Sequence, residues 1–203
     1  MTMILRSTLT SPFGRKVRMA IHHLGLQDQF EIVPASTADP DDTLRQQNPL
    51  GKMPTLILDD GTVMFDSRVI LDYIDGMAGG GRLIPAKGDA RHQTLTLAAL
   101  ADGIIDAALL ITYEARFRTE DMRSETFLTH QRDKIIRALV KLEANPPAIE
   151  PVTVGTMGLA CAFGYLDWRK ALDWRADYPA LVDWHNRFAA AVPAFAATEA
   201  PKG

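Results

Sequence analysis

Asn48-Pro-Leu-Gly-Lys-Met-Pro-Thr-Leu56 is the most informative segment of this chain. Pro54 precedes an apolar run, 55–58, that is typical of a β-strand, and proline donates no backbone hydrogen bond to a neighbouring strand. The bond between Met53 and Pro54 stands where a cis peptide would make a tight turn and present the preceding backbone outward. The N–H and C=O of Met53 are then open to an extended peptide, as in strand addition. Lys52 adds a positive charge beside them.

A second helical pattern opens at Asp66 and Ser67. A helix start presents free N–H groups to a carboxylate, while Asp66 itself offers a carboxylate to an ammonium group. Together with the segment around Met53, these residues provide a peptide-pairing edge, a cation, an anion-binding helix end and an anion. A small zwitterionic peptide fits this set of groups.

The beginning of the chain supplies a candidate for chemistry. Ser11 and Pro12 are typical of a helix opening, with serine at the N-cap and proline at the first helical position. A hydroxyl at the N-terminus of a helix stabilises an anion by a hydrogen bond and by the helix dipole. Helix N-termini lower the pKa of thiols, so a thiolate is the anion that is stabilised most. Most Ser-Pro pairs only cap a helix. Thr10 is a weaker candidate for the same donor, and the sequence does not fully separate the two.

Three motifs carry a resemblance to a known family. Ser11-Pro-Phe-Gly-Arg-Lys-Val-Arg18, Asn48-Pro-Leu-Gly-Lys-Met-Pro54 and Phe65-Asp-Ser67 resemble the glutathione-binding domain of cytosolic glutathione S-transferases. The stretches 99–108 and 164–169 resemble the helical half of bacterial members, especially the YibF type. The resemblance covers nearly the whole chain, with the motifs in the expected order.

The resemblance implies a fold and a partner. It predicts an α/β thioredoxin-like N-terminal domain over 1–78, a linker over 79–88 and an all-α helical domain over 89–203, usually as a homodimer. The strand and helix patterns of the first part agree, because they follow the order β-α-β-α-β-β-α with a hairpin turn at 59–61.

It also implies roles for individual residues. Met53, before a cis Pro54, is expected to pair its backbone with the cysteinyl part of glutathione. Asp66 and Ser67 are expected to hold the γ-glutamyl end, and Lys52 lies toward the glycine end. Because Ser11 stands where some classes carry cysteine, it is expected to activate the bound thiolate and cannot form a mixed disulfide.

The pocket for a second substrate is harder to predict. Tyr113 and Phe117 share a helix face, and with Phe13 they are candidates to line an apolar pocket for an electrophile. Ordinary core packing is the competing interpretation of each ring. Arg116 is placed to reach an anionic group, although an exposed arginine is the usual explanation.

Composition excludes several classes of protein. A net charge of −3 over 203 residues gives no broad basic surface for nucleic acid. The single cysteine, Cys161, excludes an internal disulfide framework, and the histidines lack the neighbours of a metal site. We see no signal peptide and no apolar run of 18 residues, so we expect no membrane contact and a cytoplasmic location.

Two smaller features lead to expectations about local structure. Arg15, Lys16 and Arg18 form a basic cluster that is expected to be a solvated face or, less often, to attract an anionic substrate. Thr153 is expected to cap a helix, and Thr156, where the family usually carries aspartate, is expected to weaken the reciprocal cap.

We therefore predict a glutathione transferase that is active in detoxification, with glutathione as co-substrate and no metal. It would conjugate the thiolate to a hydrophobic electrophile. A non-catalytic glutathione-fold binding or regulatory protein and a glutathione-dependent peroxidase are the alternatives.

Overall fold

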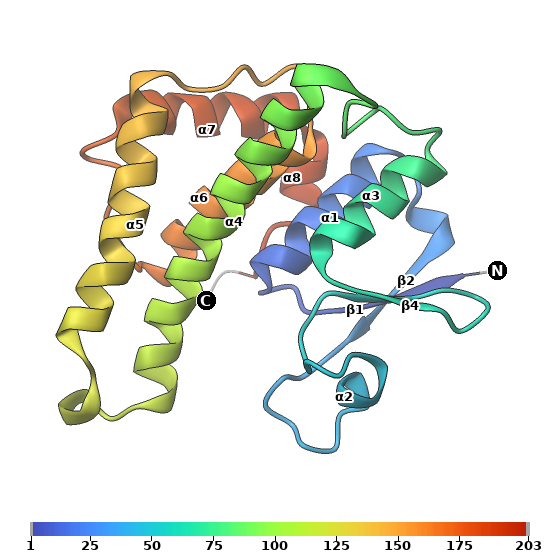
Figure 1. Ribbon diagram of the computed structural model, residues 1–203, viewed down its shortest axis with the longest axis horizontal. Helices are drawn as coiled ribbons and strands as arrows, with labels where there is room; N and C mark the ends of the chain where they lie inside the picture. Colours follow the sequence, from blue (N-terminus) through green and yellow to red (C-terminus); the bar gives the residue numbers. More distant parts are fainter. Residues whose placement is uncertain (1, 202–203) are drawn as a thin grey trace. The chain divides into compact units, whose positions relative to one another are not determined.

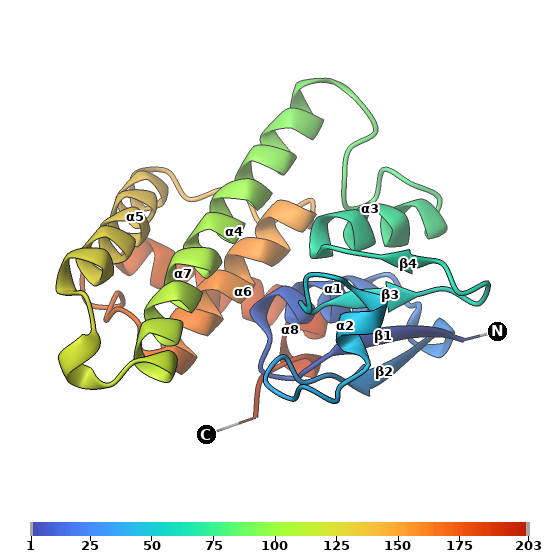
Figure 2. The same ribbon diagram turned by 60° about the horizontal axis from the view of Figure 1, so that its bottom comes forward.

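A four-stranded mixed sheet with the strand order β2-β1-β3-β4 organises the N-terminal part of the chain (Figures 1 and 2). The strands are β1 (Met3–Ser7), β2 (Phe30–Pro34), β3 (Thr55–Ile57) and β4 (Val63–Met64) in a computed structural model that describes residues 2–201. β1 pairs parallel to β2 and antiparallel to β3, with Leu5 opposite Leu56. Both leucines are fully buried, so the two central strands contribute directly to the core.

Helices cover both faces of this sheet. In Figure 1, α1 (Pro12–His23) and α3 (Ser67–Met77) lie together on one face and the short α2 (Leu44–Gln47) on the other. A short 3-10 helix, η1 (Gln27–Gln29), leads into β2. The element order is the predicted β-α-β-α-β-β-α, which confirms the thioredoxin-like fold.

The rest of the chain is helical, as predicted. Its elements are α4 (Gly88–Phe117), η2 (Glu120–Met122), α5 (Glu125–Ala144), α6 (Val154–Arg169), α7 (Pro179–Ala191) and α8 (Pro193–Ala197). The chain forms two compact units: one contains the sheet up to Arg91 together with the segment that starts at Val192, and the other runs from His92 to Ala191.

Small residues and aromatic rings hold the second unit together. A Cβ atom at Gly155 of α6 would lie 2.9 Å from the carbonyl oxygen of Thr94, so glycine permits α6 to approach α4 closely. On α6, Phe163 stacks on Trp174 with ring centroids 4.8 Å apart and meets Trp184 edge-on at 5.9 Å. Both tryptophans are almost fully buried, as expected of core residues.

The basic cluster on α1 is not a solvated face. Arg15, Lys16 and Arg18 are all buried, with at most 6% of any of them exposed. The guanidinium of Arg15 lies 4.2 Å from the ring centroid of Phe195 in α8 and donates to the Phe195 carbonyl at 3.0 Å. Sequence pattern gave no sign of this contact, because the two residues are 180 positions apart.

The capping box of α6 also corrects an expectation. The Thr153 hydroxyl accepts from the backbone N–H of Thr156, and the Thr156 hydroxyl accepts from the backbone N–H of Thr153 at 2.9 Å. A threonine oxygen at the third helical position thus reaches the same donor that an aspartate would. The predicted weakening of the box was wrong.

One helix of the described residues, α4, is long and apolar enough by composition to cross a membrane. α4 nevertheless contains no unbroken apolar run of 18 residues, because Asp102 and Asp106 interrupt it. The core helix of a soluble protein has the same composition, and Ala101, Ile104 and Ile105 of α4 are buried within the fold. Asp102 of α4 is also buried, whereas Asp106 is exposed.

Candidate functional site

The segment between α2 and β3 is shaped by hydrogen bonds to one carbonyl group. Asn48 Nδ2 and Thr55 Oγ1 both donate to the Lys52 carbonyl oxygen, at 2.9 and 3.0 Å. Asn48 Oδ1 in turn accepts from the backbone N–H of Leu50 at 3.0 Å, and Gly51 adopts the left-handed φ of +59° that the turn requires. Asn48 and Thr55 are buried, so the peptide that enters Met53 is held in a fixed orientation.

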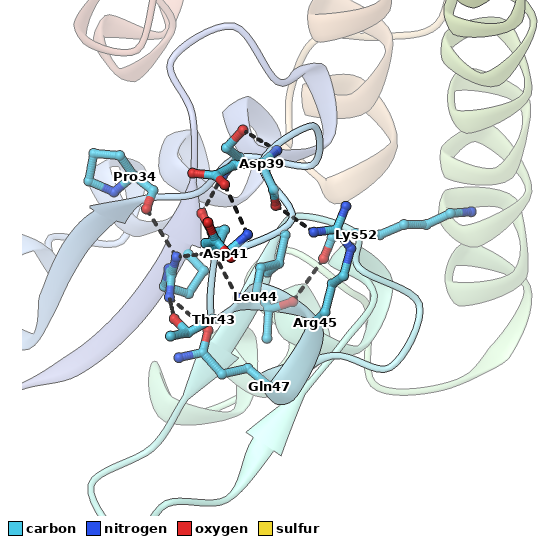
Figure 3. A network of polar contacts seen from close by, with 12 residues as sticks. Pro34, Asp39, Asp41, Thr43, Leu44, Arg45, Gln47 and Lys52 are labelled. Atoms are coloured by element: carbon cyan, nitrogen blue, oxygen red, sulfur yellow. Dashed lines mark hydrogen bonds and ion pairs between the residues drawn. The ribbon is translucent and has the colours of Figure 1, made fainter.

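Met53 itself has an open backbone. The bond between Met53 and Pro54 is cis, which confirms the prediction. Within residues 2–201 the Met53 N–H and C=O make no hydrogen bond, and the residue is half-buried. Lys52 is exposed, and its side chain extends away from the surrounding polar contacts (Figure 3). This arrangement provides a free main-chain edge with a cation beside it.

A largely buried ion pair supports this segment from the sheet. Arg6 of β1 forms a salt bridge with Asp42 at 2.7 Å and donates to Thr43 Oγ1 at 2.8 Å and Gln47 Oε1 at 2.9 Å. Arg6 also donates to the Pro34 carbonyl oxygen at the end of β2, at 3.2 Å, and Figure 3 shows Pro34, Thr43 and Gln47 in this network of contacts. We call Arg6, Asp42, Thr43 and Gln47 the Arg6 network.

Asp42 is also bound by the main chain. Its Oδ2 accepts from the backbone N–H of Ser36 at 2.6 Å and its Oδ1 from that of Leu44 at 2.7 Å. These two backbone hydrogen bonds, with the positive charge of Arg6, lower the pKa of Asp42 below its ordinary value. The sequence pattern missed this network, although a single charge inside the short apolar strand at Met3–Ser7 was a signal for it.

The mouth of α1 has the predicted cap. The Ser11 hydroxyl oxygen accepts from the backbone N–H of Gly14 at 3.0 Å, and the residue is partly exposed. Pro12 has no N–H, and in the described part of the chain the N–H of Phe13 has no acceptor. The hydroxyl hydrogen of Ser11 likewise has no acceptor within residues 2–201, so it is available to an anion at this helix end.

Thr10 lies beside Ser11 but in a different polar environment. Its Oγ1 is 3.2 Å from Thr8 Oγ1, and Thr8 Oγ1 donates to the Met53 sulfur at 3.5 Å. Met53 comes 45 residues after Thr8, so the fold brings the loop before α1 next to the start of β3. The candidate donors Ser11 and Thr10 therefore lie in the same part of the first unit as Met53.

Asp66 and Ser67 begin α3. Asp66 is its N-cap and accepts from the backbone N–H of Arg68 at 2.9 Å, while most of its side chain is exposed. Ser67 is buried. β3 and β4 pair antiparallel with Leu56 opposite Met64, and this register leads from Met64 back toward the level of Pro54 and Met53. Both groups thus lie at the same end of the hairpin.

The three residues predicted for a second-substrate pocket belong to different units. Phe13 is half-buried in the first unit, 5.4 Å from Lys16 Nζ. Tyr113 and Phe117 form an edge-to-face ring pair at 5.4 Å on α4, and Phe117 is 70% exposed, so it is not a core residue. The guanidinium of Arg116 lies 5.5 Å from the Phe117 ring. In residues 2–201 no cluster of three histidine, cysteine or acidic side chains is arranged to hold a metal.

Comparisons with known proteins agree with this geometry. The sequence profile described as "Glutathione S-transferase, N-terminal domain" matches residues 10–77. The protein called "Uncharacterized GST-like protein YibF" from Escherichia coli (strain K12) is 36% identical over 98% of this chain and 100% of its own. The chain belongs to the glutathione S-transferase family. The open backbone at Met53 therefore belongs to a protein whose family is named for the tripeptide glutathione.

Solved structures of the family are also similar. A glutathione transferase family member from Pseudomonas fluorescens Pf-5, with bound glutathione, is 43% identical over 98% of this chain and 100% of its own, with a TM-score of 0.93. A second structure from that organism, with bound S-(propanoic acid)-glutathione, is 42% identical over the same shares, with a TM-score of 0.89.

Proposed function

We propose that this chain is a glutathione transferase that uses Ser11 to stabilise the thiolate of bound glutathione. The observation that carries the proposal is the unpaired backbone of Met53, which an extended peptide can pair with as an added strand. The bound glutathione in the Pseudomonas relative supports the same choice of ligand.

The remaining contacts follow from the charges around Met53. Asp66 is exposed at the N-terminus of α3, where its carboxylate can pair with the α-ammonium group of the γ-glutamyl residue. The free N–H groups at the same helix start, with Ser67, face the neighbouring carboxylate. Lys52 is the cation for the glycine carboxylate. Glutathione then lies along Pro54 and Met53 with its sulfur toward α1.

Ser11 assists the chemical step by donating its uncommitted hydrogen to the thiolate. The cysteinyl S–H loses its proton to water, and the Ser11 O–H donates to the resulting thiolate. Lowering the pKa of the thiol by about 2 units requires roughly 2.7 kcal/mol, which one charge-assisted hydrogen bond and a helix end supply. The thiolate attacks an electrophilic carbon and an S–C bond forms. With an aryl halide, the halide departs with its electron pair; with acrylate or acrylamide, no group leaves and the neighbouring carbon takes up a proton from water.

We propose a hydrophobic electrophile as the second substrate, with Tyr113 and Phe117 of α4 as candidates to contact it. The exposed, paired rings of Tyr113 and Phe117 favour an apolar ligand. Arg116 adds a cation above Phe117, and the Pseudomonas relative binds a glutathione thioether that ends in a carboxylate. We therefore include electrophiles that carry a carboxylate. Acrylate and neutral acrylamide, compared in wild type and Arg116→Gln, test this: the substitution is expected to raise KM for acrylate alone.

Conjugation of glutathione to a generic aryl halide tests the main proposal. A transferase shows turnover that Ser11→Ala reduces, with glutathione affinity largely kept. A non-catalytic binding protein, the first alternative, would bind glutathione with no rate for the substitution to reduce. Turnover of an organic hydroperoxide in preference to the aryl halide would instead support the peroxidase alternative.

The organisation around the site is part of the same proposal. We propose that the glutathione-binding domain spans 1–78 and the helical domain 89–203, with 79–88 as a linker. Asp75 supports the linker, because its carboxylate accepts backbone N–H groups of residues 81–83. We also propose a cytoplasmic homodimer that acts in detoxification.

A further inference from the structure

We propose that Thr8 is a positioning residue that withholds Thr10 from the glutathione thiolate and so makes Ser11 the sole hydroxyl donor. This inference rests on the proposed function and adds to it, because two neighbouring hydroxyls at the mouth of α1 are otherwise equal candidates.

The assignment follows from counting hydroxyl hydrogens. Thr8 has one O–H, and its contact with the Met53 sulfur requires Thr8 to donate, because a thioether sulfur only accepts. The second contact of Thr8 Oγ1, with Thr10 Oγ1 at 3.2 Å, then requires Thr10 to donate. The single hydrogen of Thr10 is therefore directed to Thr8 and away from a ligand.

Ser11 has the opposite arrangement. Its oxygen accepts from the N–H of Gly14 at 3.0 Å, which engages a lone pair and leaves the hydrogen uncommitted. Donation to a thiolate costs Ser11 no existing bond, whereas Thr10 must first give up its bond to Thr8. Such a bond contributes enough to shift the competition about fivefold.

The contact between Thr8 and Met53 also gives the arrangement a fixed frame. Met53 is held through the Lys52 carbonyl, which Asn48 and Thr55 bind from the buried side. These bonds hold the backbone from which the Met53 side chain reaches Thr8. Because the Met53 sulfur cannot donate, the two hydrogen bonds run in one direction: Thr10 donates to Thr8, and Thr8 donates to Met53.

A rescue experiment tests the inference. Ser11→Ala is expected to raise the pKa of the bound glutathione thiol, read from the ultraviolet absorbance of the thiolate against pH. Adding Thr8→Val removes the acceptor of Thr10 and frees its hydrogen. The double variant is expected to recover the thiolate population about fivefold relative to Ser11→Ala, with a matching gain in kcat. Thr8→Ser keeps the hydroxyl, so its double variant is expected to behave like Ser11→Ala.

The outcomes separate this inference from the proposed function. If calorimetry shows that wild type does not bind glutathione, the proposed function fails and this inference with it. A second case is that glutathione binds and Ser11→Ala raises the thiol pKa. If adding Thr8→Val then brings no recovery of the thiolate population, or a further loss, only the inference is overturned. The triple variant with Thr10→Val is expected to abolish the recovery; a recovery that persists without the Thr10 hydroxyl contradicts the role of Thr10.

Discussion

The Arg6 network and the mouth of α1 are two polar regions of the same unit with opposite hydrogen-bonding states. In the network, the Arg6 guanidinium has four acceptors and lacks a partner only at Nε. At the mouth of α1, the Ser11 hydrogen and the Phe13 N–H have no acceptor among residues 2–201. The Met53 backbone shares this open state.

This contrast shows how the unit divides its polar groups between support and binding. Buried polar groups are expensive without partners, and both terminal nitrogens of the Arg6 guanidinium have them. Groups that bind a ligand must have donors or acceptors that the protein does not already use. Those of Ser11 and Met53 lie on residues that solvent partly reaches.

Breaking the Arg6 network is expected to have the largest effect. Asp42→Ala leaves Arg6 buried without its anion, and it leaves the Ser36 and Leu44 N–H groups without their acceptor. We expect the free energy of unfolding to fall by about 4 kcal/mol, measured by urea denaturation.

An exposed ion pair provides a matched control for that substitution. Arg187 and Asp183 form a salt bridge of the same length, 2.7 Å, but their side chains are 60% and 65% exposed. Asp183→Ala is expected to cost about 0.5 kcal/mol or less. Equal losses for Asp42→Ala and Asp183→Ala would show that burial of the first pair contributes nothing.

Ser11→Ala tests the open region. We expect kcat/KM for aryl halide conjugation to fall about 10²-fold, because a donor to the developing charge is lost. The substitution also removes the helix cap, so Ser11→Asp serves as the comparison: aspartate still accepts from Gly14 but has no hydrogen to donate. The account requires Ser11→Asp to keep thermal stability and lose activity. Activity within threefold of wild type for Ser11→Ala would rule out the donor role.

Asn48→Asp sharpens the link between the two regions. Aspartate keeps the acceptor for Leu50 but loses the donor to the Lys52 carbonyl, so the Met53 peptide is no longer held from both sides. We expect glutathione affinity to fall about tenfold, or about 1.4 kcal/mol by calorimetry. Asn145→Asp, at an exposed asparagine, is the charge-matched control and is expected to change affinity little. An unchanged Kd for Asn48→Asp would separate this carbonyl from binding.

The smallest predicted effect concerns pH. The pKa of Asp42 is lowered in the folded protein by the backbone of Ser36 and Leu44 and by Arg6. Its contribution to stability is therefore complete above the unfolded pKa of about 3.9 and is lost as pH falls through the lower folded value. Urea unfolding below about pH 4 is expected to show a smaller pH dependence for Asp42→Asn than for wild type. An identical slope for both proteins contradicts the assignment.

Local motifs accounted for most of what the sequence predicted correctly. The cis bond before Pro54, the Ser11 cap and the hairpin turn at 59–61 each depend on residues within a few positions of one another. The thioredoxin-like order follows from alternating strand and helix patterns. The roles of the site residues in binding and catalysis remain predictions, which the substitutions above test.

Contacts between distant residues were not predictable in the same way. Asp42 is 36 positions from Arg6, and Phe195 is 180 positions from Arg15, so no periodicity reports either pair. The contact of Arg15 with Phe195 replaced the expected solvated face. At Thr156 the error was chemical, because a hydroxyl was judged a poor substitute for a carboxylate although its oxygen reaches the same N–H.

Proton release on glutathione binding tests the central claim most directly. Calorimetric titration at pH 7 in buffers of different ionisation enthalpy counts the protons that leave the complex. If Ser11 and the helix end together lower the thiol pKa from about 8.5 to about 6.5, wild type is expected to release roughly 0.7 proton per glutathione bound. Ser11→Ala is expected to release clearly fewer protons, because only the helix end remains. Tight binding by wild type without proton release, or no binding at all, would contradict a thiolate stabilised at the mouth of α1.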